Sequence, residues 1–210
     1  MLISFSQVVD KYKMTFKGAI AAGVHWAEEH NDYLKAGIDK FVYIEPCTDA
    51  FDVLVGKFLN NASVTLFKVA CGEQEGEFDM YVSKDNQGQS NSLLKPELHI
   101  FQHPEVKFNE METVKVMPMD KLEFDRKDYN LLVMDVQGAE GMVLKGAKET
   151  LPFIDYIYTE CNRDETYSGN MQIDEMDEFL AEFGFERVET YWPSENWSWG
   201  DALYIRKTLL

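Results

Sequence analysis

Residues 131–138 read Leu131-Leu132-Val133-Met134-Asp135-Val136-Gln137-Gly138, which is four apolar residues followed by an acid and, three positions later, a glycine. A short apolar run of this kind is typical of a strand that is buried on both faces, as in a parallel sheet. A segment with helical character follows at 138–151 and is ended by Pro152. The stretch therefore predicts a buried strand, a polar strand end and a covering helix, which is the repeating unit of α/β proteins.

The same unit recurs on both sides of this stretch. Other apolar runs predict buried strands at 19–22, 41–44, 64–70 and 156–159. Segments with helical character separate them, at 26–36, 51–59 and 173–183. This order predicts a mostly parallel sheet with helices on both faces. The last two strands, 185–192 and 202–205, have no helical pattern between them, so we expect an antiparallel hairpin at the C-terminal end.

The length of 210 residues favours one domain, 1–210, because domains usually have about 150 residues. Residues 72–120 interrupt the strand and helix alternation with a turn, an alternating strand near 77–82, a polar loop and a further strand at 114–117. We interpret 72–120 as an insertion beside the sheet, because it is too poor in helical faces to form a domain of its own.

The composition restricts the partners. Twenty Lys and Arg against 37 Asp and Glu give a net charge of −17, which disfavours nucleic acid and anionic membrane surfaces because both would repel the chain. No apolar run approaches the ~20 residues of a membrane span, and 1–7 lacks the pattern of a secretory signal. Three cysteines are too few for a disulfide scaffold, so we expect a cytoplasmic protein with reduced thiols.

Polar residues follow each predicted parallel strand, at the sheet edge where open α/β folds bind ligands. Glu45 lies 22 residues after Gly23, the spacing at which such folds bind the two ribose hydroxyls of a nucleoside. Each residue alone has a simpler explanation, since Gly23 could form an ordinary turn and Glu45 could be a solvated strand end. Together, the polar strand ends predict a nucleoside-type ligand.

The loop after the first strand narrows the choice of nucleoside. A dinucleotide site needs G-x-G-x-x-G, whereas 23–28 has no second or third glycine and ends in Glu28. An acid at this place opposes a pyrophosphate but tolerates an ammonium group, which favours S-adenosylmethionine. An NAD-dependent oxidoreductase remains the alternative, and a third is a domain that binds cofactor or glycan without catalysis.

Several motifs, in order and with similar spacing from about Gly18 to Ile205, resemble the FkbM-type S-adenosylmethionine-dependent methyltransferases. They are Gly18-x4-Gly23-x-His25-x2-Glu28-Glu29, Ile44-Glu45-Pro46, Val69-Ala70-Cys71-Gly72-Glu73, Ser90-Asn91-Ser92-Leu93-Leu94, Met134-Asp135-Val136-Gln137-Gly138-Ala139-Glu140 with Leu144-Lys145-Gly146-Ala147, and Trp199-Gly200-Asp201-Ala202. The resemblance implies a Rossmann-like class I methyltransferase with a seven-stranded sheet, and O-methylation of sugar hydroxyls in glycans or glycosylated metabolites, as in polysaccharide biosynthesis. One departure is Ala27, where the family usually has a second glycine.

The residues at the strand ends receive specific roles. We expect Glu45 to bind the ribose, the backbone of 23–25 to approach the methionine end, and Ala70 and Cys71 to lie near adenine. The full set of candidate cofactor-binding residues is Gly23, Val24, His25, Glu45, Pro46, Ala70, Cys71, Ser92, Asp135 and Val136. The candidate acceptor-binding residues are Glu160, Asn162 and Trp199. Three groups compete as the base that takes the hydroxyl proton: Asp135 first, His25 second, then Glu160.

Other readings of the same residues stay open. Asp135 and Glu160 could hold Mg²⁺, and His99 and His103 have the spacing of metal ligands, but our prediction is a site without metal. Trp192, Trp197 and Trp199 could stack on a sugar ring or pack within the hairpin. Base-methylating enzymes of this fold usually have Asn/Asp-Pro-Pro-aromatic after the fourth strand, a motif that 135–138 lacks. The expected partner is therefore a carbohydrate or a glycosylated small molecule, and a homodimer is left open.

Overall fold

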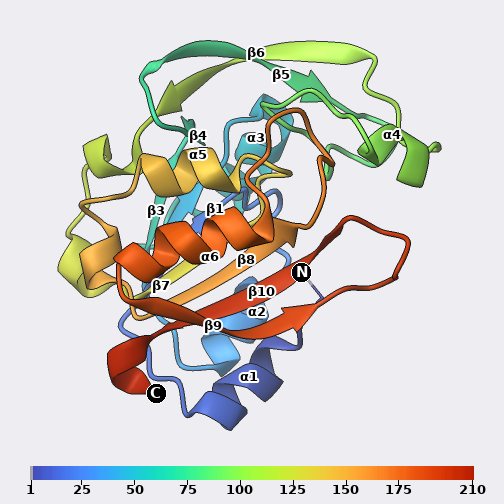
Figure 1. The fold of residues 1–210 in the computed structure, drawn as a ribbon. Helices are drawn as coiled ribbons and strands as arrows, with labels where there is room; N and C mark the ends of the chain where they lie inside the picture. The colour runs from blue at the N-terminus through green and yellow to red at the C-terminus, as the bar shows by residue number, and fades with distance from the viewer. Residues whose placement is uncertain (1) are drawn as a thin grey trace.

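A seven-stranded, mostly parallel sheet forms the centre of the computed structural model, which describes residues 2–210 (Figure 1). Its strand order is β3-β2-β1-β7-β8-β10-β9, and β10 runs antiparallel to both of its neighbours. The strands are β1 (Ala19–Ala22), β2 (Phe41–Ile44), β3 (Val64–Phe67), β7 (Leu131–Met134), β8 (Tyr156–Asn162), β9 (Phe185–Tyr191) and β10 (Trp199–Arg206). The predicted fold class and the C-terminal antiparallel hairpin are confirmed.

Helices cover both faces of this sheet, as the apolar strands require. Alternate strand residues such as Ala21, Tyr43 and Val133 pack with α1 (Phe5–Tyr12), α2 (His30–Lys35) and α3 (Thr48–Phe58). The intervening residues, such as Ala22, Ile44 and Met134, pack with α5 (Glu140–Lys145) and α6 (Ile173–Glu182), which lie in front of the sheet in Figure 1. Because successive side chains of a strand point to opposite faces, one apolar run supplies both cores.

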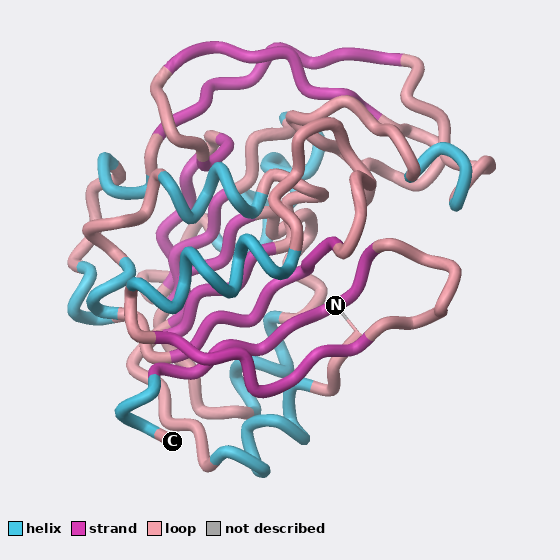
Figure 2. The backbone as a smooth tube through the Cα atoms, viewed as in Figure 1, coloured by secondary structure: helices cyan, strands magenta, loops and turns pink. Residues whose placement is uncertain are grey.

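Strands of the segment interpreted as an insertion, 72–120, join β4, which lies just before it, in a second, three-stranded sheet with the order β4-β6-β5. Its elements are β4 (Ala70–Cys71), β5 (Gly76–Val82), β6 (Glu110–Met117) and the short helix α4 (His99–Gln102). The single strand predicted at 64–70 is wrong, because the chain leaves the main sheet after Phe67 and β4 pairs with Val116 and Met117 instead. Loops connecting the two sheets and α4 gather between them, as the pink segments of Figure 2 show.

Several helix boundaries differ from the predictions. Residues 26–29 form turns rather than the start of a helix, because Ala27 has a φ of 54° and the Glu28 carboxylate accepts a hydrogen bond from the Trp26 N–H. The helix predicted at 138–151 is confined to α5, after which turns lead to a 3₁₀ helix at Leu151–Phe153. Helix α1 was not predicted. The remaining 3₁₀ helices are Met119–Lys121, Arg126–Asp128 and Lys207–Leu209.

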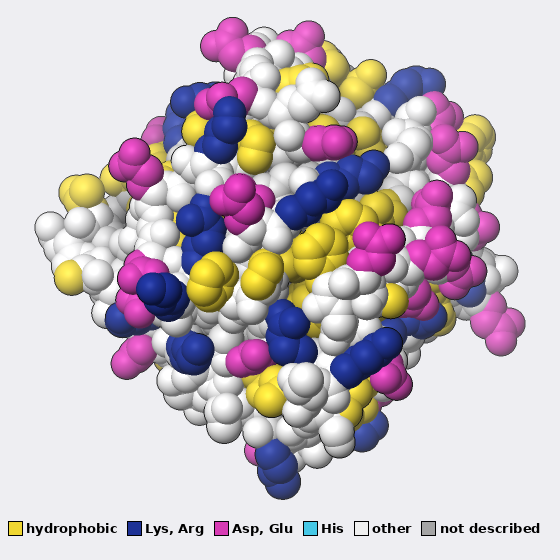
Figure 3. Space-filling view, turned by 60° about the vertical axis from the view of Figure 1, so that its left-hand side comes forward, with side chains coloured by type: hydrophobic (Ala, Val, Ile, Leu, Met, Phe, Trp, Pro, Cys, Tyr) yellow, Lys and Arg dark blue, Asp and Glu magenta, His cyan; other side chains and the backbone are white. Residues whose placement is uncertain are grey.

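The surface carries charges of both signs. Figure 3, which brings the left-hand side of Figure 1 forward, shows basic and acidic side chains interspersed on that face. Among the described helices, none combines the length and apolar character needed to cross a bilayer.

Strands β1 and β7 come unusually close where they end. Gly23 follows β1 with a φ of +76°, and a Cβ atom placed on it would lie 1.9 Å from the carbonyl oxygen of Asp135. Real Cβ atoms never approach a backbone oxygen so closely, and the left-handed backbone favours glycine as well. Only glycine fits this point, where the sheet changes from strands added on one side of β1 to strands added on the other.

We therefore expect Gly23→Ala to lower the free energy of unfolding by more than 2 kcal/mol, because the methyl group must displace the β7 backbone in addition to straining its own. Urea denaturation measures the loss. Gly37→Ala is the matched control, since Gly37 has a φ of +86° but no atom within 4 Å of the added Cβ. The control should cost only the backbone strain, about 1–2 kcal/mol; equal losses in the two variants would contradict the close approach.

Candidate active site

Five polar or small residues form one row across the ends of the strands. Ile44, Ala22, Met134 and Thr159 are aligned as neighbours in the sheet. The next residue of each strand or strand end is Glu45, Gly23, Asp135 or Glu160, and Asp201 on β10 pairs with Glu160. The row lies at the carboxyl edge of the parallel strands and spans the switch point between β1 and β7, where open α/β sheets bind ligands.

Glu45 is buried and is held by backbone groups on both sides. Its Oε2 accepts a hydrogen bond from the His25 N–H and its Oε1 from the Cys47 N–H, each at 2.9 Å. Burial raises the pKa of Glu45, and the two backbone hydrogen bonds oppose this shift. Each carboxylate oxygen can accept a further hydrogen bond, so the fixed carboxylate can bind two ligand hydroxyls.

Gln137 connects the centre of the row. Its side-chain N–H₂ donates to Asp135 Oδ1 at 2.8 Å and to Glu160 Oε2 at 2.9 Å, and its side-chain oxygen accepts from the Tyr167 hydroxyl at 2.9 Å. The Gln137 backbone has a φ of 53°, in the left-handed region that glycine prefers. A strained residue whose amide group links two carboxylates marks this turn as a constrained part of the site.

Two further carboxyl groups near Asp135 are buried. Burial raises the pKa of Glu160 well above its usual range, and the nearby Asp135, Glu140 and Asp201 raise it further. Burial also raises the pKa of Glu140 to about 7, although its Oε1 accepts hydrogen bonds from the N–H groups of Val136 and Gly138. Glu140 therefore holds the backbone of the turn that follows β7.

His25 links the loop after β1 to the loop after β5. Its Nδ1 lies 2.8 Å from Glu28 Oε1, its Nε2 lies 2.9 Å from the carbonyl oxygen of Gln87, and its ring stacks on Trp26. In this conformation both ring nitrogens lie within hydrogen-bond distance of protein oxygens, so the ring is engaged in holding the two loops together. This engagement favours Asp135 over His25 as the base.

A cavity of about 1200 Å³ lies along the row and extends to the insertion. Nine of the ten candidate cofactor-binding residues line it; Ser92 does not, because its buried hydroxyl donates to the Gln137 carbonyl oxygen. Glu160 and Trp199 also line the cavity. Asn162 does not: it is fully buried, and neither atom of its amide group has a hydrogen-bond partner.

The cavity is strongly acidic. Its described lining includes nine Asp and Glu residues but a single lysine, Lys84, and no arginine. The acidic residues are Glu28, Glu29, Glu45, Asp49, Glu110, Glu112, Asp135, Glu160 and Asp201. Such a lining favours neutral or cationic ligands and disfavours phosphates.

Some residues of the site were not predicted from the sequence. Gln137 and Glu140 stood within the most specific motif, but their contacts depend on the fold of the turn. Tyr167, His99 at the start of α4 and His103 directly after it reach the cavity from distant segments, and no local sequence signal placed them there. Within residues 2–210, no group of three or more His, Cys, Asp or Glu side chains is arranged to hold a metal ion.

Ala27 is the one departure from the family pattern that the sequence showed. Its φ of 54° lies in the left-handed region, where a glycine is favoured. The alanine methyl group is buried and packs in the core beside α2. The loop therefore keeps a conformation suited to glycine, with an alanine in it.

Comparison with known proteins places these features in a family. Residues 22–187 match the sequence profile of the Methyltransferase FkbM domain. The chain is also similar to the 2-O-methyltransferase NoeI of Sinorhizobium fredii, with 32% identity over 125 residues, which are 56% of this chain and 51% of that protein. The chain thus spans about half the length of this curated relative.

Solved structures with the same fold include two methyltransferases. The methyltransferase FkbM from Methylobacillus flagellatus superimposes with a TM-score of 0.57 and 14% identity, over 90% of this chain and 43% of that one. The magnesium protoporphyrin IX methyltransferase ChlM from Synechocystis, with bound S-adenosylmethionine, gives 0.52 and 10% identity, over 95% and 74%. At these identities the likeness concerns the fold.

The raised pKa of Glu140 predicts a pH dependence of stability. The unfolded chain loses this proton near the ordinary value of 4.5 and the folded chain near 7, so stability should fall as pH rises between these values. Glu140→Gln keeps an acceptor for the backbone but cannot ionise, and should reduce the difference in unfolding free energy between pH 4.5 and 7.5 by about 1–3 kcal/mol.

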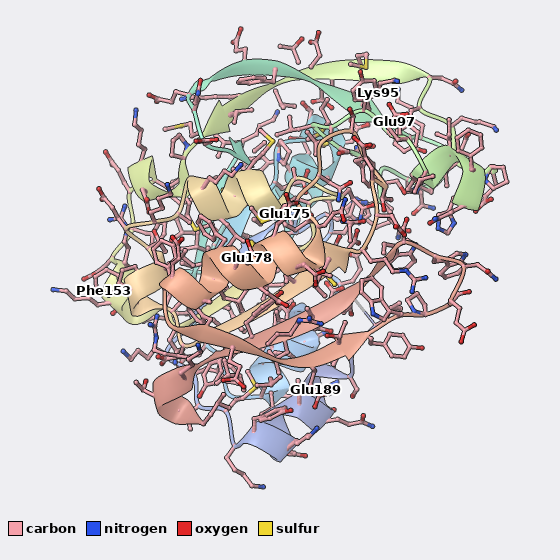
Figure 4. All side chains as sticks on the ribbon, viewed as in Figure 1. Lys95, Glu97, Phe153, Glu175, Glu178 and Glu189 are labelled. Carbon is pink, nitrogen blue, oxygen red and sulfur yellow. The ribbon has the colours of Figure 1, made fainter. Side chains whose placement is uncertain are left out.

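Urea denaturation at the two pH values measures this difference. Glu178 is exposed on helix α6 and is labelled in Figure 4. Glu178→Gln is the control for the loss of one negative charge. An equal reduction in both variants would mean that the overall charge of the protein, and not the burial of Glu140, causes the pH dependence.

Proposed function

The chain belongs to the FkbM methyltransferase family, and from this premise we propose that it is an S-adenosylmethionine-dependent O-methyltransferase acting on a sugar hydroxyl. The observation that supports the proposal most is the row of Glu45, Gly23, Asp135 and Glu160 at the switch point of the sheet, inside an acidic cavity. The proposed acceptor is a glycan or a glycosylated metabolite.

The residues of the row fit this cofactor. Glu45 presents a fixed carboxylate to the two ribose hydroxyls, with Pro46 beside it. Gly23 brings bare backbone to the cavity, and we assign the methionine end to the loop 23–25 and to Asp135 and Val136. Ala70 and Cys71 form an apolar wall for adenine. Ser92 supports this arrangement indirectly, through its hydrogen bond to Gln137.

The charge of the cavity argues against the NAD alternative. A pyrophosphate would meet a lining with nine Asp and Glu residues and one lysine, whereas the ammonium and sulfonium groups of S-adenosylmethionine are cations. Three residues of the loop after β1 have a positive φ: Gly23, His25 and Ala27. Only one of them is a glycine, so the loop is not the glycine-rich turn of a dinucleotide site. Acidic walls equally disfavour an anionic acceptor such as a nucleic acid.

S-adenosylmethionine, held by the residues assigned above, would supply an activated methyl group on a positively charged sulfur for transfer to a hydroxyl oxygen. The chain's own residues must align the hydroxyl and take its proton. We assign the proton to Asp135, because Gln137 holds its Oδ1 and Asp135 lines the cavity. Glu160, whose raised pKa favours the neutral acid, is assigned to acceptor binding.

The name of the relative supports the oxygen as the methylated atom. NoeI is a 2-O-methyltransferase, and the match covers 56% of this chain. A domain that binds its ligands without catalysis is the remaining alternative, and it differs from our proposal in a single respect: no acceptor would be methylated. Transfer from labelled S-adenosylmethionine to rhamnose-, fucose- and mannose-type glycosides, detected by mass spectrometry, tests the proposed function, and a peptide or lipid acceptor would contradict the sugar assignment.

Cofactor binding should depend on Glu45. Glu45→Gln keeps one acceptor oxygen for the backbone but removes the charge, and we expect it to weaken S-adenosylmethionine binding about tenfold or more, because hydrogen bonds to a charged group contribute about 1.5–3 kcal/mol. Isothermal titration calorimetry measures the change, with Glu178→Gln as a control of equal charge loss. Affinity within twofold of the wild type would exclude the ribose role, and tight NADH binding without S-adenosylmethionine binding would favour the oxidoreductase.

Turnover should depend on Asp135. Asp135→Asn retains an oxygen that accepts the hydrogen bond from Gln137 but is a far poorer proton acceptor, so the methylation rate should fall by about 10²–10⁴ while cofactor affinity stays within a few-fold. His25→Gln, compared in the same assay, should mainly change cofactor affinity. A near-normal rate for Asp135→Asn would exclude Asp135 as the base.

A further inference from the structure

The chain has four histidines, and among the described residues the ring of His99 differs from the other three in having no hydrogen-bond partner. His25 is bonded to Glu28 and to the backbone of Gln87, and His30 is bonded to the Tyr43 hydroxyl. His103 accepts a hydrogen bond from the Trp199 indole N–H at 3.1 Å. Within residues 2–210, no hydrogen bond reaches the ring of His99, and its Nδ1 is completely buried.

The position of His99 makes this absence significant. The residue begins α4, is 95% buried and still lines the cavity. Burial lowers its pKa to about 4, with a smaller contribution from His103, so the ring is neutral at pH 7. A neutral imidazole has one N–H group and one lone pair, and leaving the buried Nδ1 without a partner is costly.

Aromatic rings hold His99 in place and extend the surface around it. Its ring lies 5.4 Å from Tyr167, 5.2 Å from Phe108 and 5.1 Å from His103, measured between centroids. Beyond His103, Trp199 is fixed by its hydrogen bond and stacks on Trp197 at 5.5 Å, with 14° between the planes. His99, His103, Tyr167 and Trp199 all line the cavity, and we call these four residues the α4 wall.

Hydrogen bonds connect the α4 wall to the proposed base. The Tyr167 hydroxyl donates to the side-chain oxygen of Gln137, and the amide N–H₂ of the same Gln137 donates to Asp135. The wall is therefore joined to Asp135 through two side chains. A ligand lying against it would be within reach of the reacting groups.

We propose that the α4 wall is the acceptor subsite, where one neutral sugar ring lies against the aromatic side chains and a ring hydroxyl bonds to the free imidazole of His99. The assignment rests on the proposed function, since it identifies where that acceptor binds. A hydroxyl both donates and accepts, so it matches a neutral imidazole, and the C–H groups of a sugar suit the negative face of an aromatic ring. The acidic lining of the cavity disfavours an acidic sugar.

Saturation-transfer NMR tests the subsite with methyl glycosides of rhamnose, fucose and mannose as probes, on the full chain saturated with S-adenosylhomocysteine. We expect at least one glycoside to bind the wild type. His99→Phe preserves the ring packing but removes both polar atoms, and should weaken that binding tenfold or more. His99→Asn restores a donor and an acceptor, and should recover most of the affinity.

Trp192→Phe is the matched control, because Trp192 packs against the core on the α6 side and does not line the cavity; it should leave glycoside binding unchanged. Binding within twofold of the wild type in His99→Phe, or no binding of any glycoside to the wild type, would overturn the subsite. Calorimetry with S-adenosylhomocysteine on the same samples tests the proposed function separately. If that titration failed, the glycoside measurement without cofactor would still decide the subsite.

Discussion

The close approach of β1 and β7 at Gly23 and Asp135 is the constraint on which the rest of the site depends. The gap leaves no room for a Cβ atom, so the two strand ends are held at a fixed separation by backbone contact. Strand order reverses between these strands, and the loops that leave them diverge and open a space at the sheet edge. Glu45 on one side and Glu160 on the other are aligned with this pair by the sheet register.

Placing carboxylates along a buried edge is unfavourable for stability, and the structure compensates for it locally. Backbone N–H groups bind Glu45 and Glu140, the Gln137 amide group joins Asp135 to Glu160, and Asp201 accepts hydrogen bonds from the N–H groups of Leu2 and Ile3. Burial nevertheless raises the pKa of Glu45, Glu140, Glu160 and Asp201. The resulting negative cavity suits a cationic cofactor and a neutral acceptor better than a phosphate.

The insertion completes the site from outside the main sheet. Strand β4 redirects the chain after Phe67, and the loop after β5 returns to the cofactor side, where Gln87 contacts His25 and Ser92 contacts Gln137. Helix α4 then brings His99 and His103 against Tyr167 and Trp199, which belong to the C-terminal part of the chain. The cavity is thus enclosed by segments that are up to about two hundred residues apart, from Leu2 to Asp201, for which local sequence patterns carry no information.

The sequence by itself determined the fold class, the positions of the main strands along the chain and the strand-end residues Gly23, Glu45, Asp135 and Glu160, because buried parallel strands are continuous apolar runs. The order of the strands in the sheet and the place of Asp201 beside Glu160 came from the structure. It also determined the family, through motifs whose spacing survives in this chain. Only the tertiary structure decided where β3 ends, that residues 26–29 turn instead of forming a helix, that Ser92 and Asn162 lie outside the cavity, and that His99 lines it. Those outcomes depend on hydrogen bonds and packing between distant segments, which compete with local preference and are set only when the segments meet in the folded chain.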